Sequence, residues 1–229
     1  MNLFDILGPI MVGPSSSHTA GAVRIGLISR QLLGRKPKTA RIYLHGSFAA
    51  TGHGHGTDCA LVAGLLGMSE DDPRIPESYE AAKEQGLSFT MENKEIRGAH
   101  PNTAELFLTA EDGTQICVQA SSIGGGRILV NKIDGIEVNF SGEHDTLIVY
   151  NQDRPGLVSE VTSLMAYSGI NIGTLQLFRD KRGGTAVMVA EVDHSLPKEA
   201  IWMIRRLDGV LKANYVTMEK KAERKESDR

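Results

Sequence analysis

The sequence predicts an α+β protein in two parts, an N-terminal α/β domain followed by a smaller module with the element order βαββαβ. Three observations predict this organisation. Residues 1–72 are rich in Gly, Ser, His and Ala and place apolar residues at helical spacing. Residues 73–140 alternate apolar and polar residues, as strands do. After a linker-like polar stretch at 141–145, residues 146–218 show strand and helix patterns in compact succession.

In the first part, helical spacing predicts a helix over 20–33, and a second helix over 59–66 ends at Gly67. Runs of β-branched and apolar residues predict strands at 40–44, 87–91, 105–109 and 115–120. Asp112–Gly113 predicts a hairpin turn between the last two strands, and the pattern at 131–138 predicts another hairpin. We place this domain at residues 1–142.

In the second part, the element pattern is regular. Strands are predicted at 146–150, 175–178, 186–192 and 210–218, and helices at 157–168 and 196–207. The resulting βαββαβ order is the ferredoxin-like arrangement. We place this module at 146–218, and we expect the charged tail at 219–229 to be a frayed helix end or disordered.

Composition narrows the class of protein. The chain has 229 residues, of which 41% are hydrophobic and 23% charged, so it is neither collagen-like nor wholly disordered. Its net charge of -3 gives no overall basic footprint, so nucleic acid is not an expected partner. Asp5 and Pro9 interrupt the apolar N-terminal run, and no apolar stretch approaches the roughly 20 residues of a membrane span. We therefore expect a cytoplasmic protein without a membrane segment.

The two cysteines, Cys59 and Cys117, allow at most one disulfide. This number excludes a disulfide-stapled secreted scaffold and favours a reducing compartment. It also means that this chain alone cannot supply the four thiolates of a zinc ribbon or an iron–sulfur cluster.

A polar motif precedes the first predicted helix. It consists of Ser15, Ser16, Ser17, His18 and Thr19. Hydroxyl groups gathered at a helix N-terminus can hold a carboxylate or another anion, and a histidine beside them can act as acid or base near neutral pH. The simpler alternative is a helix cap followed by a surface histidine.

A second polar segment follows the strand at 40–44, with histidines interleaved among glycines. Its candidate pocket residues are His45, Ser47, His53, His55, Thr57 and Asp58. A His-x-His pair can chelate a metal when extended. The rival interpretation is a polar pocket whose glycines let the backbone approach a ligand. Because the sequence offers no further definite ligand, we favour the pocket and expect no metal.

A third candidate is the glycine-rich segment Ser121–Arg127, which predicts a turn that could form a phosphate or carboxylate nest. Arg127 could pair with an anion there. A tight loop with a solvated arginine is the alternative, since such loops also require glycine.

The second module resembles the ACT domain. The resemblance rests on Asn151–Gly156 after its first strand and Gly169–Ile172 after its first helix, and it covers about 70 residues. It implies a regulatory module that often binds small amino acids between paired copies. The positions matching such a ligand site are Asn151, Asp153, Gly156, Leu157, Asn171 and Ile172. ACT copies that only dimerise are also common, so both interpretations stay open.

The first domain resembles the small chain of the two-chain iron–sulfur-dependent L-serine dehydratases, and its fold is similar to an allosteric substrate-binding domain. The resemblance rests on Gly13–Thr19, His45–Ser47, Gly52–Asp58 and Ser121–Gly126. It implies a subunit of an enzyme that converts L-serine to pyruvate and ammonia, a step of amino-acid catabolism that feeds gluconeogenesis.

The same resemblance implies how the work is divided between two chains. An alpha subunit carries a four-iron four-sulfur cluster whose iron binds the substrate hydroxyl, and a monovalent cation is associated with the family. In this heterodimer the present chain contributes Ser15, Ser16, Ser17, His18 and Thr19 to a composite site, with His18 in proton transfer or substrate orientation. Two alternatives remain: a stand-alone amino-acid-binding regulator without catalysis, and a metal-dependent hydrolase using His53 and His55.

Overall fold

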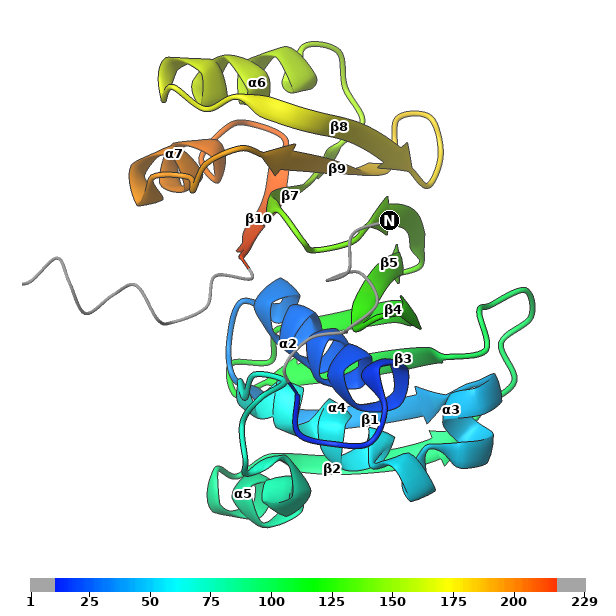
Figure 1. The fold of residues 1–229 in the computed structure, drawn as a ribbon. Coiled ribbons are helices and arrows are strands. Elements are labelled where there is room, and N and C mark those ends of the chain that lie inside the picture. Colours follow the sequence, from blue (N-terminus) through cyan, green and yellow to red (C-terminus); the bar gives the residue numbers. More distant parts are fainter. Residues whose placement is uncertain (1–10, 218–229) are drawn as a thin grey trace, which may run out of the picture.

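The structure, a computed structural model, describes residues 11–217 and contains two β-sheets (Figure 1). The first sheet has six strands in the order β2-β1-β3-β4-β5-β6, and β1 and β2 are parallel whereas the other neighbours are antiparallel. Its strands are β1 (Pro37–Leu44), β2 (Ser88–Asn93), β3 (Thr103–Ala110), β4 (Gln115–Gly124), β5 (Arg127–Ile133) and β6 (Ile136–Phe140).

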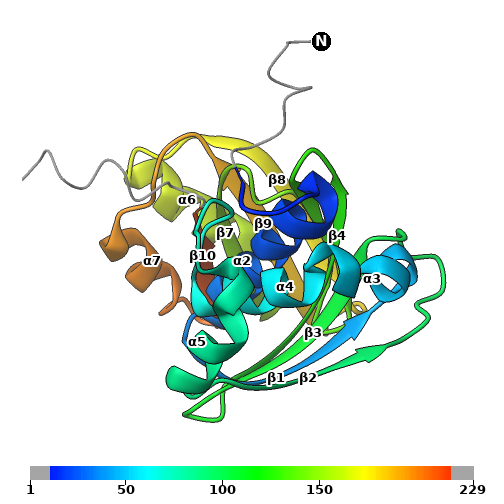
Figure 2. The same ribbon diagram turned by 60° about the horizontal axis from the view of Figure 1, so that its bottom comes forward.

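Helices cover one face of this sheet, as Figure 2 shows. They are the π-helical turn η1 (Ser16–Ala20), α2 (Gly21–Leu33), α3 (Gly46–Thr51), α4 (Thr57–Leu66) and α5 (Ser78–Glu84), with short 3-10 segments η2 (His53–His55) and η3 (Ile75–Glu77). Because η1 runs directly into α2, residues of the first polar motif belong to the first turns of a long helical segment.

Gly26 and Gly64 allow the backbones of α2 and α4 to come into direct contact. A Cβ on Gly64 would lie 2.1 Å from the carbonyl oxygen of Val23, and a Cβ on Gly26 would lie 2.3 Å from that of Leu61. Side chains larger than hydrogen are excluded at this crossing. The close contact fixes the two helices relative to each other.

The second module contains a four-stranded antiparallel sheet in the order β10-β7-β9-β8. Its elements are β7 (Asp145–Gln152), α6 (Leu157–Tyr167), β8 (Ile172–Arg179), β9 (Thr185–Val192), α7 (Lys198–Ile204) and β10 (Val210–Val216). The order βαββαβ confirms the predicted α+β class and the ferredoxin-like module.

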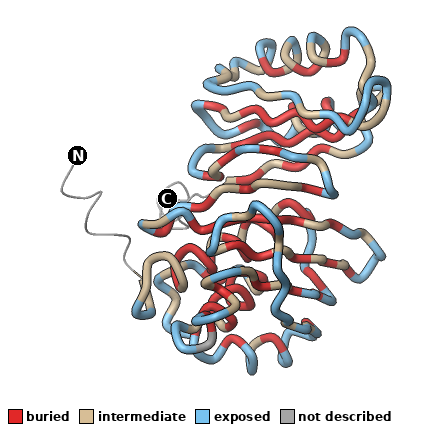
Figure 3. Tube along the Cα trace, turned by 90° about the vertical axis from the view of Figure 1, so that its right-hand side faces the viewer, coloured by how far each residue is buried: buried red, intermediate tan, exposed pale blue. Residues whose placement is uncertain are grey.

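The two sheets share a hydrophobic core (Figure 3). Leu147 and Val149 of β7 pack with α6 and α7, whereas Ile148 and Tyr150 face the first domain and join its core. Polar contacts add to this junction: the side chain of Asn214 donates to the Leu32 carbonyl oxygen, and Gln31 exchanges two 2.8 Å hydrogen bonds with the Thr217 backbone. The second module is therefore packed against the C-terminal half of α2.

Differences from the sequence-based predictions are local. Helices α3 and α5 were not expected, and several strands are longer than predicted. The interpretation of Ser121–Arg127 as a nest is wrong in part, because β4 extends to Gly124 and the hydroxyls of Ser121 and Ser122 are buried within it. The turn itself consists of Gly125 and Gly126, and both of these glycines and Gly124 have positive φ.

Some expectations concern residues outside the described range. These are the tail at 219–229, the end of the last predicted strand at Met218, and the first ten residues. Among the described residues, no helix is long and apolar enough to span a membrane.

Candidate functional site

The candidate site forms where η1 meets the segment that follows β1. Ser15 caps η1, with its Oγ accepting the backbone N–H of His18 at 3.1 Å. The chain leaves β1 through His45 and enters α3, which carries Ser47 and Thr51 on one face, four residues apart. The fold therefore brings His18 of η1 close to the hydroxyls of Ser47 and Thr51 on α3.

His18 lies at the centre of this cluster. Its Nε2 is 3.0 Å from Ser47 Oγ and 3.2 Å from Thr51 Oγ1, and its Nδ1 is 3.5 Å from Ser15 Oγ. The imidazole also contacts the ring of His55, with centroids 5.2 Å apart, and meets the ring of Phe48 edge-on at 5.4 Å. His18 itself is half-buried, so the cluster remains accessible from outside.

The environment of His18 favours its neutral form. Burial lowers the pKa of His18, the neighbouring His55 lowers it further, and a hydrogen bond with the Ser47 backbone acts in the opposite direction. A neutral imidazole near neutral pH is a competent proton acceptor.

Thr19 ties two segments of the cluster together, whereas Thr57 and Asp58 lie at the start of α4. The Thr19 hydroxyl is buried and donates to the carbonyl oxygen of His55 at 3.2 Å, which ties η1 to η2. Thr57 begins α4, and its buried Oγ1 has no hydrogen-bond partner among the described residues. Asp58 is also buried at the start of α4 and accepts the backbone N–H of Cys59 at 2.9 Å.

The structure does not gather all the predicted residues around His18. His45 turns away: its Nδ1 accepts the Ile96 N–H at 3.1 Å, and it lines a separate hollow of about 380 Å³ with residues of the 93–95 segment. Ser16 and Ser17 are half-buried in η1 and make no side-chain hydrogen bond within residues 11–217. The side chain of His53 lies outside the described part of the chain.

Sequence reasoning missed Thr51 and Phe48. Both belong to α3, a helix of six residues that is too short to show an apolar periodicity. The signal that could have found Thr51 is its spacing of four from Ser47, which places both hydroxyls on one face of a helix.

The predicted ACT ligand residues fall at two ends of the second sheet. At one end, Gly156 has a left-handed φ of 87° and is the N-cap of α6, and Leu157 is buried. Asp153 accepts hydrogen bonds there from Arg179 and the Gly183 N–H. At the other end, Asn171 donates to Asp193 at 2.6 Å, and Ile172 begins β8. One chain therefore does not bring these two groups together.

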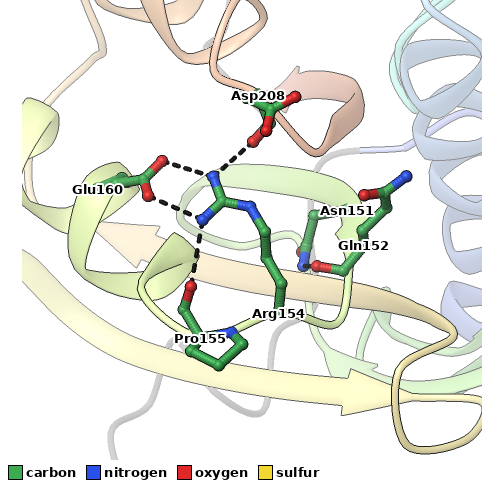
Figure 4. Close-up of polar contacts among 6 residues, drawn as sticks. All are labelled: Asn151, Gln152, Arg154, Pro155, Glu160 and Asp208. Atoms are coloured by element: carbon green, nitrogen blue, oxygen red, sulfur yellow. Dashed lines mark hydrogen bonds and ion pairs between the residues drawn. The ribbon is translucent and has the colours of Figure 1, made fainter.

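Arg154 closes the loop at the first of these ends (Figure 4). Its guanidinium binds both carboxylate oxygens of Glu160 at 2.9 and 2.8 Å and donates to the carbonyl oxygens of Pro155 and Asp208. The side chain of Asn151, next to it, is buried and donates to the Gln152 carbonyl oxygen. Arg154 thus links the start of α6 to the turn before β10.

The described residues do not form a metal or cluster site. No three His, Cys, Asp or Glu side chains among them gather closely enough to hold a metal ion. Both cysteines are free thiols, and burial raises the pKa of Cys59 and raises that of Cys117 to about 12. Protonated thiols on two different elements do not fit an iron–sulfur cluster.

Comparison with known proteins identifies the family. The family model described as serine dehydratase beta chain matches residues 2–85, and the ACT domain model matches residues 146–201. A probable L-serine dehydratase beta chain of Bacillus subtilis (strain 168) is 36% identical over 215 residues, covering 94% of this chain and 97% of that protein. The chain belongs to the L-serine dehydratase beta-chain family.

A second beta chain agrees with this assignment, and a different enzyme shares part of the sequence. The L-serine dehydratase beta chain of Peptoniphilus asaccharolyticus is 37% identical over 214 residues, which are 93% of this chain and 96% of that one. A D-3-phosphoglycerate dehydrogenase of Methanocaldococcus jannaschii is 29% identical over 124 residues, which are 52% of this chain and 24% of that protein. These matches confirm the family that the polar motifs of the first domain predicted. They also confirm that the second module is an ACT domain.

Proposed function

We propose that this chain is the beta subunit of a two-chain cytoplasmic L-serine ammonia-lyase and supplies the His18 cluster to an active site completed by an alpha subunit. The observation that carries the proposal is the arrangement of Ser15, Ser47, Thr51 and His55 around a half-buried imidazole whose pKa is lowered by burial. Such a cluster can bind a small polar substrate and exchange a proton with it, but it lacks any group that would activate a hydroxyl for departure.

The residues of this chain have distinct roles in the proposal. The first turn of η1 presents the backbone N–H groups of Ser16 and Ser17, which suit the α-carboxylate of L-serine. His18 accepts the α-proton: the Cα–H bond breaks, a bond to an imidazole nitrogen forms, and the electron pair stays on the substrate. That electron pair forms the Cα=Cβ double bond as the Cβ–O bond breaks, and the departing hydroxide takes up the proton held by His18 and leaves as water. The aminoacrylate that remains hydrolyses to pyruvate and ammonia.

The four-iron four-sulfur cluster of this proposal belongs to the alpha subunit, because the two cysteines of this chain do not fit one. When bound there it supplies Lewis-acid chemistry.

Reconstitution tests the proposal. The purified chain alone is expected to be colourless and inactive, and dehydration of L-serine should appear on anaerobic mixing with an iron–sulfur alpha chain. His18→Ala should lower the turnover of the pair by more than about tenfold, a typical contribution of a positioned acid or base. His194→Ala, at an exposed histidine of the ACT domain, is the matched control and should leave turnover unchanged.

Two results would overturn the proposal. Dehydration of L-serine by the isolated chain would exclude a shared site. Tight binding of L-serine to the isolated chain by calorimetry, together with no activity in any mixture, would instead favour the stand-alone regulator.

We further propose that the ACT domain pairs with a second copy through β8. This strand is at the edge of its sheet, and Leu175 and Leu177 on it are 41% and 47% exposed. Antiparallel pairing about a two-fold axis near the middle of β8 would set Ile172 of one copy opposite Arg179 of the other. Asn171 would then approach the loop that holds Asp153, so that pairing would assemble the two halves of the predicted amino-acid site.

Sedimentation velocity can test this pairing. Leu177→Asp should shift the chain toward monomer, because it places a charge in the apolar contact between two edge strands. Leu211→Asp is the matched control, since Leu211 is 58% exposed on β10 at the opposite edge of the sheet. An unchanged distribution for Leu177→Asp, or an equal effect of both variants, would contradict pairing through β8.

A further inference from the structure

The hydrogen-bond pattern around His18 also determines which of its two ring nitrogens carries the proton. A neutral imidazole has one N–H donor and one lone-pair acceptor, and its neighbours select between the two tautomers. The decisive neighbour is Thr51, whose hydroxyl is 2.9 Å from the carbonyl oxygen of Ser47 and 3.2 Å from His18 Nε2.

A hydroxyl has a single proton to donate. A carbonyl oxygen can only accept, so the 2.9 Å contact between Thr51 and the Ser47 carbonyl uses the Thr51 proton. The Thr51 oxygen can then only accept from His18, which requires a proton on Nε2. Ser47 Oγ, at 3.0 Å from the same nitrogen, can accept from it as well.

The other side of the ring is consistent with this arrangement. Ser15 Oγ accepts the backbone N–H of His18, and its own proton is free to point toward Nδ1 at 3.5 Å. With the proton on Nδ1 instead, the Ser47 hydroxyl could donate to Nε2. The Nε2 lone pair would still face the Thr51 oxygen at 3.2 Å, however, because the Thr51 proton is held by the Ser47 carbonyl. The Nε2–H tautomer satisfies every one of these contacts together.

We infer that Thr51 is a positioning residue that holds neutral His18 as its Nε2–H tautomer, so that Nδ1, on the Ser15 side of the ring, is the nitrogen that accepts a proton. The catalytic meaning of this assignment rests on the proposed function, whereas the tautomer itself is a property of the chain alone.

Nitrogen-15 NMR of the histidine-labelled chain tests the tautomer directly, because protonated and unprotonated ring nitrogens have widely separated shifts. The His18 signals are assigned by their absence in His18→Gln and recorded above the pH at which His18 titrates. The full-length chain is expected to show unprotonated Nδ1 and protonated Nε2. Predominantly protonated Nδ1 would overturn the inference without need of any Thr51 variant.

Substitution of Thr51 tests its role. Thr51→Val removes the acceptor at nearly constant shape and should shift the tautomer ratio by about two- to tenfold toward Nδ1–H, the range expected from one hydrogen bond. Thr51→Ser keeps the acceptor and should restore the normal ratio. Identical His18 shifts in Thr51→Val and the unaltered chain would overturn the role of Thr51.

A matched control exists in the ACT domain. The hydroxyl of Thr162 donates to the Val158 carbonyl oxygen at 2.9 Å in the same i−4 geometry, but none of its hydrogen bonds reaches a histidine. Thr162→Val should therefore leave the His18 shifts unchanged. If Thr162→Val changed the His18 shifts as much as Thr51→Val does, the change would result from a general loss of stability. That result would overturn the positioning role of Thr51.

Activity separates the inference from the proposed function. In the reconstituted pair, Thr51→Val should lower kcat with little change in KM, and Thr51→Ser should recover it. If the NMR result is as expected but His18→Ala and Thr51→Val both leave turnover intact, the tautomer assignment stands and the catalytic role of His18 fails.

Discussion

His18 shows how the function of a residue depends on groups that are distant in sequence. Its hydrogen-bond partners come from positions 15, 47 and 51, and the neighbouring imidazole ring is that of His55. The motif Gly13–Thr19 predicted a polar helix start with a usable histidine, but the pair of hydroxyls on α3 could not be predicted without recognising that helix. A histidine next to a cap is common, whereas a histidine enclosed on both nitrogens by hydroxyls is suited to proton exchange.

The pH dependence of activity should reflect the lowered pKa of His18. Burial and His55 both disfavour the imidazolium, so the neutral form persists below the ordinary histidine pKa of about 6.5. The acid limb of kcat/KM in the reconstituted pair should therefore lie below that value. His55→Asn removes the second cause, so the pKa of His18 should rise and the limb should move to higher pH.

An exposed histidine provides the control for this experiment. His144→Asn should leave the limb in place, and a limb that does not move in His55→Asn would contradict the coupling. The lowered pKa of His18 also makes the stability of the folded chain depend on pH. Between the folded and the unfolded pKa of His18, the unfolded chain binds more protons at His18 than the folded chain does. Its contribution to stability is therefore full above the unfolded pKa and falls as pH drops toward the folded pKa.

The two thiols should be unreactive in the folded chain. Burial, then Glu105 and Asp134, raise the pKa of Cys117 to about 12, and burial, then Asp58, raise the pKa of Cys59. Since the thiolate is the reactive species, labelling by iodoacetamide at neutral pH should be slow in the native chain and fast in denaturant. Mass spectrometry measures both rates, and rapid native labelling of either cysteine would contradict the assigned environments.

At the scale of the elements, long periodic segments were predictable and short ones were not. Helix α2 and the apolar strands β3, β7 and β9 show clear patterns over many residues, which predicted their presence and type. The six residues of α3 cover less than two turns and begin at Gly46, whose φ of 57° and position against Pro101 depend on the tertiary structure. Phe48 and Thr51, which the sequence did not predict as site residues, therefore lie on α3, a short helix whose formation depends on tertiary contacts.

The glycine contact between α2 and α4 is an element-scale feature that supports the site. Gly64→Ala would place a methyl group 2.1 Å from the Val23 carbonyl oxygen and 2.8 Å from the Leu27 nitrogen, both backbone atoms within a helix. The helices must separate, and a net loss of about 1–3 kcal/mol in the free energy of unfolding is expected, as for other overpacked sites. Because η1 continues into α2, the distance between His18 and the start of α4 should change too, and turnover should fall.

Urea titration measures the loss in Gly64→Ala. Gly54→Ala is the matched control, since a Cβ there meets nothing within 4 Å. Equal midpoints for both variants would show that α2 and α4 can separate without cost, contrary to the contact described.

At the scale of the whole molecule, the sequence suggested two domains joined by a linker, whereas the structure joins them through one core. The signal was available: Leu147–Tyr150 and Ala186–Val192 are nearly unbroken apolar runs, and an antiparallel strand that is apolar on both faces requires cover on both. Helices α6 and α7 cover one face of the ACT sheet, and the first domain covers the other. The apolar pattern of a single strand shows that both of its faces are buried. It does not show which part of the chain packs against the second face.

A shared core predicts that the two domains unfold together. Asn214 of β10 is buried and donates to the Leu32 carbonyl oxygen at the end of α2, so Asn214→Ala leaves that carbonyl without its partner at the junction. The expected loss is about 1–3 kcal/mol. Calorimetry of the full chain should show one transition that moves to lower temperature as a whole, whereas Asn139→Ala, at an exposed asparagine, should leave it in place. Two separate transitions, of which only one moves, would mean that each domain is stable without the other. The contact between the ACT domain and α2 would then not couple the ACT domain to the His18 cluster.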